Sequence, residues 1–124
     1  MQIVSSPLAH KINKEFECSG IKKPNSAYFY DGDNLFIGNA GGVNGFTMDE
    51  AASALPVEIT KHGHRYHFYV GKTINPYKET IEVQYVAGYA NRTGSAFVIE
   101  FHNVNPAEAM GELLCWYLKE GRNV

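Results

Sequence analysis

The sequence predicts an α+β fold in which an N-terminal helix, a β-hairpin and a short helix precede a four-stranded antiparallel meander packed on a C-terminal helix. Three observations predict it: apolar residues recur every four positions near the N-terminus, every second position from residue 57 onward, and at helical spacing over residues 110–117. No repeat, low-complexity run or linker divides the chain. We therefore expect a single domain over residues 1–124, with a seam only at 55–56 and a meander-plus-helix core over 57–120.

The first segment is expected to form a short amphipathic helix. Ser6 suits the N-cap and Pro7 the first helical position, where a missing N–H costs little. Gly20 ends the pattern. The apolar stripe of this helix consists of Leu8, Ile12 and Phe16.

A hairpin and a second, brief helix are expected next. Residues 27–30 and 35–38 flank Asp31-Gly32-Asp33-Asn34, residue types that favour a tight turn. Residues 38–45 are rich in Gly and Asn and lack periodicity, so they predict a connecting loop. Thr47 and Glu50 then form a capping box, which predicts a helix that ends before Pro56.

The second half predicts four strands and a final helix. Alternating apolar residues predict the inward side of the strands, and Asn105-Pro106-Ala107-Glu108 predicts the start of a helix that ends at Gly121. Met110, Leu113, Leu114 and Tyr117 form a stripe that would cover the apolar side of the sheet. The expected inward residues are Val57, Ile59, Tyr66, Phe68, Val70, Ile81, Val83, Tyr85, Phe97, Ile99 and Phe101.

Composition and charge exclude several classes of protein. The 124 residues are 44% hydrophobic and 19% charged, which argues against disorder, and the net charge of -2 lacks the basic excess of a nucleic-acid binder. No secretory signal or apolar run of about 18 residues is present, so we expect a cytoplasmic protein of a bacterial host cell without membrane contact. His62 and His64 would point away from His67 and no cysteine pair lies nearby, so no metal is expected. The sequence also has no strong cofactor motif, so no other cofactor is expected.

The opposite side of the meander carries the richest set of polar residues. It could bind a partner or ligand, or it could be no more than the solvated side of an antiparallel sheet. In an alternative, catalytic hypothesis, paired histidines and carboxylates supply a general acid and base. The binding candidates on the sheet are Arg65, His67, Tyr69, Gln84 and His102, and the catalytic alternatives are His67, His102, Glu82 and Glu100.

Two weaker candidate sites lie in the first half. The Gly-rich segment stands between a strand and a helix start, a placement that suits anion binding through Gly41, Gly42, Gly45 and Thr47. Two acidic residues at the helix start oppose an anion there, so a plain connecting loop is the competing interpretation. Tyr28 and Tyr30, in the hairpin, could instead stack on a partner or lie in the core.

The end of the chain resembles a family of phage proteins. The strand expected over residues 96–102, followed by Asn105-Pro106-Ala107-Glu108-Ala109 and the helix to Gly121, is similar to the close of the small phage ABA sandwich domain and of other short proteins of temperate bacteriophages. This segment covers about a fifth of the chain. The resemblance implies a phage or prophage accessory protein that acts by binding rather than by catalysis, and it carries over no functional residue.

These observations predict a non-enzymatic protein that binds and inhibits a host protein, such as a component of a bacterial defence system. Aromatic residues and Asn/Gly-rich loops in a lightly charged chain suit a protein interface. The alternative is a small-ligand or nucleotide-binding protein that could also be hydrolytic and that uses the polar sheet side or the Gly-rich loop. A homodimer formed through an edge strand at 57–61 or 96–102 is a third hypothesis.

Overall fold

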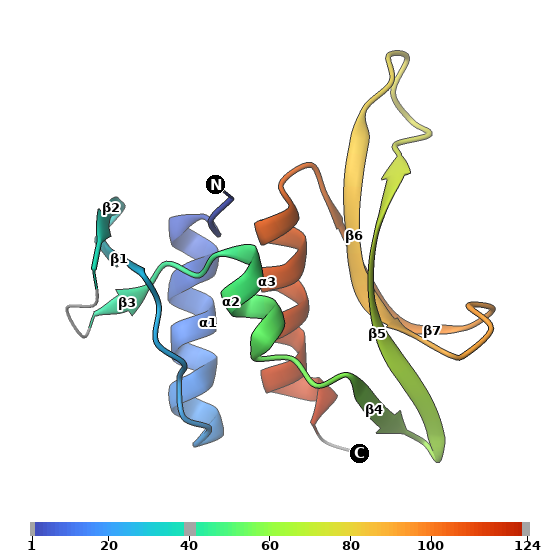
Figure 1. Ribbon diagram of the computed structural model, residues 1–124, viewed down its shortest axis with the longest axis horizontal. Helices are drawn as coiled ribbons and strands as arrows, with labels where there is room; N and C mark the ends of the chain where they lie inside the picture. The colour runs from blue at the N-terminus through green and yellow to red at the C-terminus, as the bar shows by residue number, and fades with distance from the viewer. Residues whose placement is uncertain (1, 39–41, 123–124) are drawn as a thin grey trace.

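The computed structural model describes residues 2–38 and 42–122, and it confirms the predicted α+β class. In Figure 1 the helices form a middle layer between a small sheet and a large one. The three helices are α1 (Ser6–Ser19), α2 (Met48–Ser53) and α3 (Pro106–Trp116), and α3 continues into one π-helical turn, η1 (Tyr117–Gly121). The small sheet contains β1 (Tyr28–Asp31), β2 (Asn34–Ile37) and β3 (Val43–Asn44), and the large sheet contains β4 (Glu58–Lys61), β5 (His64–Ile74), β6 (Val83–Ala90) and β7 (Phe97–Asn103).

The large sheet is the predicted antiparallel meander, in the order β4-β5-β6-β7. Residues opposite one another in neighbouring strands share a face of the sheet. One such row runs from Phe68 through Tyr89 to Ile99, and these three side chains face α3. We call this the inner face of the sheet and the opposite side its outer face. β4 and β7, the two strands named in the dimer hypothesis, are the edges.

The core lies between the inner face and the helices. The α3 stripe is confirmed, because Met110, Leu113 and Leu114 are at most 1% exposed. Tyr89 is fully buried against Trp116, with ring centroids 6.3 Å apart, and its hydroxyl donates a hydrogen bond to the Pro56 carbonyl at 2.7 Å. This hydrogen bond therefore ties β6 to residue 56, where the sequence suggested a boundary between the two halves of the chain.

The α1 helix differs from expectation only at its first turn. Leu8, Ile12 and Phe16 are buried as predicted. The helix begins at Ser6 rather than after it, and the Ser6 hydroxyl donates to the Asp33 carboxylate at 2.9 Å instead of capping α1. The Ser6 side chain thus joins the start of α1 to the β1–β2 turn.

The small sheet contains one strand where the sequence predicts a loop. The hairpin of β1 and β2 is confirmed, with Gly32 at a positive φ of 61° in its turn. Val43 and Asn44 form β3 by pairing with β1, although the segment was expected to lack regular structure. A strand of two residues is too short to show a period of two, so the pattern could not reveal it.

Glu50 connects α2 to the start of the hairpin. The predicted capping box is present: the Thr47 hydroxyl accepts from the Glu50 amide at 3.2 Å, and Glu50 Oε1 accepts from the Thr47 amide at 2.9 Å. The same carboxylate also accepts from the Ser26 hydroxyl at 2.8 Å and from the Ala27 amide at 2.9 Å. One side chain therefore satisfies groups of two segments that are far apart in sequence.

The inward pattern is wrong at two ends of the large sheet and at Ile81, which precedes β6 and is 79% exposed. A β-bulge shifts the register between β6 and β7, so that Phe97 pairs with Ala90 and lies on the outer face while Val98 packs toward the core. An extra residue in a strand reverses the alternation beyond it, which a strict period of two cannot anticipate. Val57 precedes β4; its backbone carbonyl accepts from the Phe68 amide, but its side chain is 77% exposed and lies outside the core.

The hairpin of β5 and β6 extends beyond the helices that cover the rest of the sheet (Figure 1). We call its far part, residues 70–85, the arm. Within it Ile74 pairs with Val83, and these inner-face side chains are 56% and 48% exposed. α3 packs against β6 and β7 but begins only at Pro106, so it leaves this end uncovered. None of the described helices is both long and apolar enough to cross a membrane.

Candidate functional site

The outer face of the large sheet carries most of the polar residues that the alternation placed there. Its rows are defined by the register of the strands. One row joins Glu58, His67, Ala90 and Phe97. The next rows join Tyr69, Gly88 and Glu100, then Gly71, Val86 and His102, and then Thr73 and Gln84. Arg65 lies opposite Thr60, beyond the first of these rows.

Tyr69 of β5 and Glu100 and His102 of β7 form a hydrogen-bonded chain that crosses over β6. The Tyr69 hydroxyl donates to Glu100 Oε2, and His102 Nε2 lies 2.5 Å from Glu100 Oε1. Gly88 of β6 lies between Tyr69 and Glu100 in the row, and its lack of a side chain lets Tyr69 extend over β6 to Glu100. A Cβ at Gly88 would lie 3.0 Å from the Tyr69 hydroxyl oxygen and 3.1 Å from Tyr69 Cε1, so the tyrosine ring occupies the space that a side chain would need.

Burial and the hydrogen bonds between Tyr69, Glu100 and His102 shift the pKa values of Glu100 and Tyr69. Burial alone would raise the pKa of the Glu100 carboxyl, but hydrogen bonds from Tyr69 and His102 favour its charged form and leave the pKa below its ordinary value. Burial, and then the hydrogen bond to the Glu100 carboxylate, raise the pKa of the Tyr69 hydroxyl. At neutral pH the Glu100 carboxylate is therefore the charged acceptor and the Tyr69 hydroxyl a neutral donor.

The lowered pKa of Glu100 makes a prediction about stability and pH. A carboxyl whose pKa is lower in the folded than in the unfolded chain stabilises the fold above its ordinary pKa of 4.5 and loses that contribution as the pH falls through the folded value. Replacing Glu100 with Gln removes this titration. Urea unfolding from pH 7 to pH 3 should show the wild-type advantage over Glu100→Gln shrink below about pH 4.5. A constant difference across this range would contradict the assignment.

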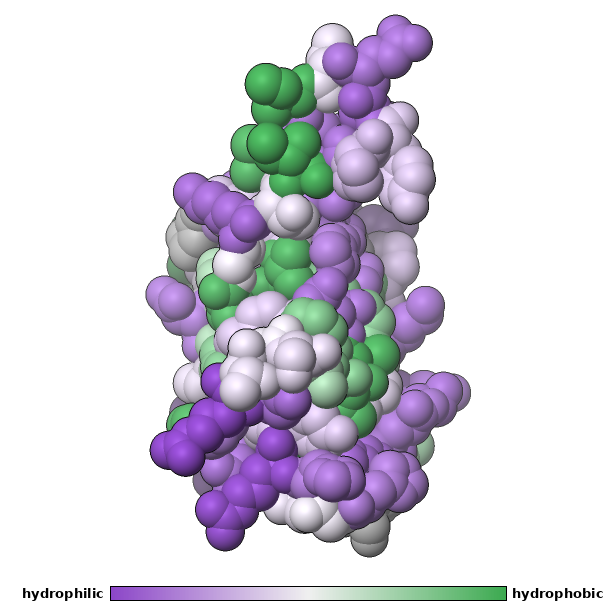
Figure 2. All heavy atoms as spheres, turned by 90° about the vertical axis from the view of Figure 1, so that its right-hand side faces the viewer, coloured by the Kyte–Doolittle hydropathy of each residue, from purple (hydrophilic) through white to green (hydrophobic). Residues whose placement is uncertain are grey.

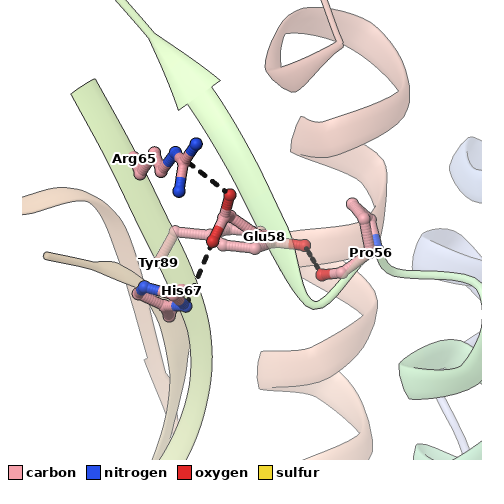
Figure 3. A network of polar contacts seen from close by, with 5 residues as sticks. All are labelled: Pro56, Glu58, Arg65, His67 and Tyr89. Atoms are coloured by element: carbon pink, nitrogen blue, oxygen red, sulfur yellow. Dashed lines mark hydrogen bonds and ion pairs between the residues drawn. The ribbon is translucent and has the colours of Figure 1, made fainter. Parts of the chain in front are cut away.

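A second polar cluster lies at the β4 edge of the outer face. In Figure 3 the side chains of Arg65 and His67 both point toward the Glu58 carboxylate. Arg65 Nε lies 3.7 Å from Glu58 Oε1, and His67 Nδ1 lies 3.6 Å from Glu58 Oε2. These are ion-pair distances rather than short hydrogen bonds, so Glu58 orients both groups without saturating their donors.

Of the four residues of the catalytic alternative, Glu100 and His102 come together, while His67 and Glu82 lie apart from them. His67 lies opposite Ala90 and His102 opposite Val86, so the two rows are four residues, or roughly 13 Å, apart along β6. Glu82 lies at the far end of the arm, where Lys78 Nζ is 3.8 Å from its carboxylate. The structure therefore offers two separate polar clusters instead of one acid–base site.

The Gly-rich segment uses its backbone amides inside the fold. Gly45 N–H donates to the Tyr28 carbonyl at 2.9 Å, and Thr47 is the N-cap of α2. The carbonyl of Gly42 accepts from Lys23 Nζ at 3.2 Å. Gly41 lies outside the described residues. The described part of this segment serves to join β3 to α2 and presents no cradle of free amides.

The two hairpin tyrosines differ in their surroundings. Tyr30 packs against the hydrophobic core, and its hydroxyl donates to the Val4 carbonyl at 2.6 Å. Tyr28 lies opposite Ile37 at the other end of β1 and is partly buried. Tyr30 therefore has a structural role, while Tyr28 lies partly exposed at the surface.

Two residues of the outer face were not among the sequence candidates. Arg92, in the turn between β6 and β7, lines the same hollow as Glu58, Arg65 and His67. Phe97 lies 5.8 Å from Tyr69, measured between ring centroids. Arg92 lies in a turn without periodicity, and the bulge places Phe97 on the outer face, so neither position shows in the pattern.

The comparisons with known proteins add no family to these observations. Within residues 2–38 and 42–122, no three or more His, Cys, Asp or Glu side chains are grouped so as to hold a metal ion. Neither the protein-family models, nor the curated proteins, nor the solved structures contain a match to this chain.

Proposed function

We propose that the chain is a non-enzymatic accessory protein of phage or prophage origin that acts by occupying a host protein. The phage origin rests on the resemblance of its C-terminal strand and helix described above. The observation that supports binding is the arm, whose apolar inner side is not covered by the rest of the described chain. A component of a bacterial defence system is the kind of target that we have in mind.

The exposed side chains of the arm suit an interface. Tyr77 and Ile81, in the connection between β5 and β6, are 93% and 79% exposed, and the paired Ile74 and Val83 at the ends of these strands are 56% and 48% exposed. Figure 2, seen from the outer side of the large sheet, shows a group of hydrophobic residues at the upper end of the molecule, next to hydrophilic ones. Contiguous exposed apolar residues with a polar rim are typical of surfaces that bind other proteins.

The charges of the arm indicate the chemistry of the partner. Lys72 is the single charged residue among the inner-face positions of β5 and β6 in the arm, and its Nζ lies 5.4 Å from the centre of the Tyr85 ring. Glu82 is engaged with Asn75 and Lys78 instead. A complementary partner would present an apolar strip with a carboxylate opposite Lys72.

Catalysis has less support. The four residues of the hydrolytic alternative are not one site: His67 and Glu82 lie apart from the others, and Glu100 and His102 are engaged with each other and with Tyr69. General acid–base chemistry needs the two groups within reach of one substrate. We therefore favour binding over turnover.

The test compares two charged substitutions on opposite faces of one strand. Ile74→Asp places a carboxylate on the apolar inner side of the arm, and Thr73→Asp places the same charge on the outer face. Tagged wild type and both variants are incubated with bacterial lysate, and retained proteins are quantified by mass spectrometry. We expect a host protein that wild type and Thr73→Asp retain and that Ile74→Asp loses by about tenfold or more.

Three results would contradict the proposal. Equal retention by all three proteins would exclude the arm as the contact, and no specific retention would exclude a host partner in that lysate. Light scattering after size exclusion gives the third: if wild type is a dimer that Ile74→Asp makes monomeric, the arm binds a second copy instead. Because Ile74 is mostly exposed, the midpoint of thermal unfolding of Ile74→Asp should be close to that of wild type. An unchanged midpoint shows that misfolding is not the cause of a loss of binding.

A further inference from the structure

The end of the outer face opposite the arm contains two adjoining hollows. The smaller one is lined by Glu58, Arg65, His67 and Arg92. The larger one, of about 600 Å³, is lined in part by His67, Arg92, Tyr69 and Phe97. His67 and Arg92 belong to both linings, so the hollows meet at these two side chains. This region is separate from the arm, so a ligand bound here would not depend on the proposed protein partner.

The larger hollow is bordered by three ring-bearing side chains, those of His67, Tyr69 and Phe97. His67, Ala90 and Phe97 lie in one row, so the small Ala90 forms its floor between two ring-bearing residues. The backbones of His67 and Phe97 are two strand spacings, or roughly 9.6 Å, apart. Both side chains rise from the same face of the sheet, so the space above Ala90 lies between them. The Tyr69 ring, next to Phe97, closes a third side.

The smaller hollow is suited to an anion. It contains two guanidinium groups and one carboxylate, which gives an excess of one positive charge before any protonation of His67. Glu58 shares its charge between Arg65 and His67. Arg92 forms no hydrogen bond or ion pair with the part of the chain that the structure describes. Arginine forks bind phosphate oxygens in a bidentate manner, so Arg65 and Arg92 are the expected anion ligands.

The turn that carries Arg92 is held in place before any ligand arrives. The Asn91 side-chain oxygen accepts from the amides of Ser95 at 3.0 Å and Ala96 at 3.2 Å, and the Gly94 amide donates to the Asn91 carbonyl at 3.0 Å. Gly94 adopts a positive φ of 72°, which closes the turn. A preformed turn lowers the entropic cost of binding, because the backbone of Arg92 is already fixed in place before the ligand binds.

We propose that these joined hollows bind a phosphate monoester of a planar ring, specifically a nucleoside monophosphate. The base stacks over Ala90 between His67 and Phe97, and the phosphate lies between Arg65 and Arg92. The two subsites are adjacent because His67 and Arg92 line both. No bond is made or broken in this proposal: the ligand is bound and released unchanged.

Calorimetric titration of the full chain with AMP, adenosine and inorganic phosphate tests the proposal. We expect AMP to bind more tightly than either part alone, because each part fills one hollow. Arg92→Ala should weaken AMP binding by about tenfold or more, since a charge-assisted hydrogen bond is lost. Phe97→Leu should weaken AMP binding while leaving the response to phosphate unchanged. Lys22→Ala, which removes an exposed cation from the N-terminal half, is the matched control and should bind like wild type.

Several outcomes would overturn the proposal. AMP that fails to bind at about 1 mM, or that binds Arg92→Ala as well as wild type, would exclude the site. Equal affinity for AMP and phosphate would exclude the ring subsite. O-phosphotyrosine also combines a planar ring with a phosphate. If it binds more tightly than AMP, the ligand of the site is a phosphorylated side chain and not a nucleotide. Since Arg92 and Phe97 are exposed, unchanged thermal unfolding of both variants is expected and keeps the comparison valid.

Discussion

Replacing Gly88 with alanine is expected to destabilise the fold by about 2 to 3 kcal/mol, although the change adds a single methyl group. A Cβ at this position would lie 2.5 Å from the Ile99 carbonyl oxygen, which belongs to the backbone of β7. The clash cannot be relieved by rotating a side chain, so β6 and β7 must separate locally. The same methyl group would press against Tyr69 and weaken its hydrogen bond to Glu100.

Gly71 provides the matched control for this change. It lies on the outer face in the adjacent strand, and a Cβ there would meet nothing within 4 Å. Gly71→Ala should be neutral or stabilising by up to about 1 kcal/mol, because alanine restricts the unfolded chain. Chemical unfolding of both variants measures the difference. If Gly88→Ala were as stable as Gly71→Ala, the close approach of β6, β7 and Tyr69 would be wrong.

Replacing Ile12 with alanine is expected to cost about 2 to 5 kcal/mol. Ile12 is fully buried in the hydrophobic core, and its Cδ1 lies 3.3 Å from where a Cβ on Gly111 would be, so α1 and α3 approach closely there. Removing three carbon atoms leaves a cavity that these packed helices cannot close. The midpoint of thermal unfolding should fall by roughly 10 °C or more.

Ile81→Ala is the matched control, since it removes the same atoms from an isoleucine that is 79% exposed. Its unfolding midpoint should stay within about 2 °C of wild type, because surface substitutions change stability little. The pair also bears on function. If Ile81→Ala were as destabilising as Ile12→Ala, the arm would belong to the folded core, and its apolar residues would need no partner to explain them.

The sequence predicted the large sheet well where strands are long and regular. Along β5, the alternation from Tyr66 to Tyr69 placed each side chain on the correct face, because side chains in a strand alternate strictly. It failed at Phe97 and Val98, where a bulge inserts one residue. Bulges depend on how a partner strand is joined, and one strand alone carries no signal for that.

The sequence predicted which polar residues share the outer face of the large sheet, but it did not predict which of them are in contact. The alternation grouped His67 with His102, yet the strand register separates them, and register depends on loops as well as on strands. Glu100 and His102 lie two residues apart on one strand, so their contact could have been anticipated. The contribution of Arg92 could not, because a turn residue has no periodic pattern and its position follows from how the turn folds.

Glu50 links the stability of α2 to that of the segment before β1. α2 has only six residues, and an isolated helix of that length is not stable in water. Its capping carboxylate is also the acceptor for Ser26 and Ala27, at the entrance to the hairpin. The Ser26 hydroxyl and the Ala27 amide gain this acceptor only when α2 is in place, so we expect α2 and the start of the β1–β2 hairpin to stabilise one another, despite the more than 20 residues that separate these contacts along the chain.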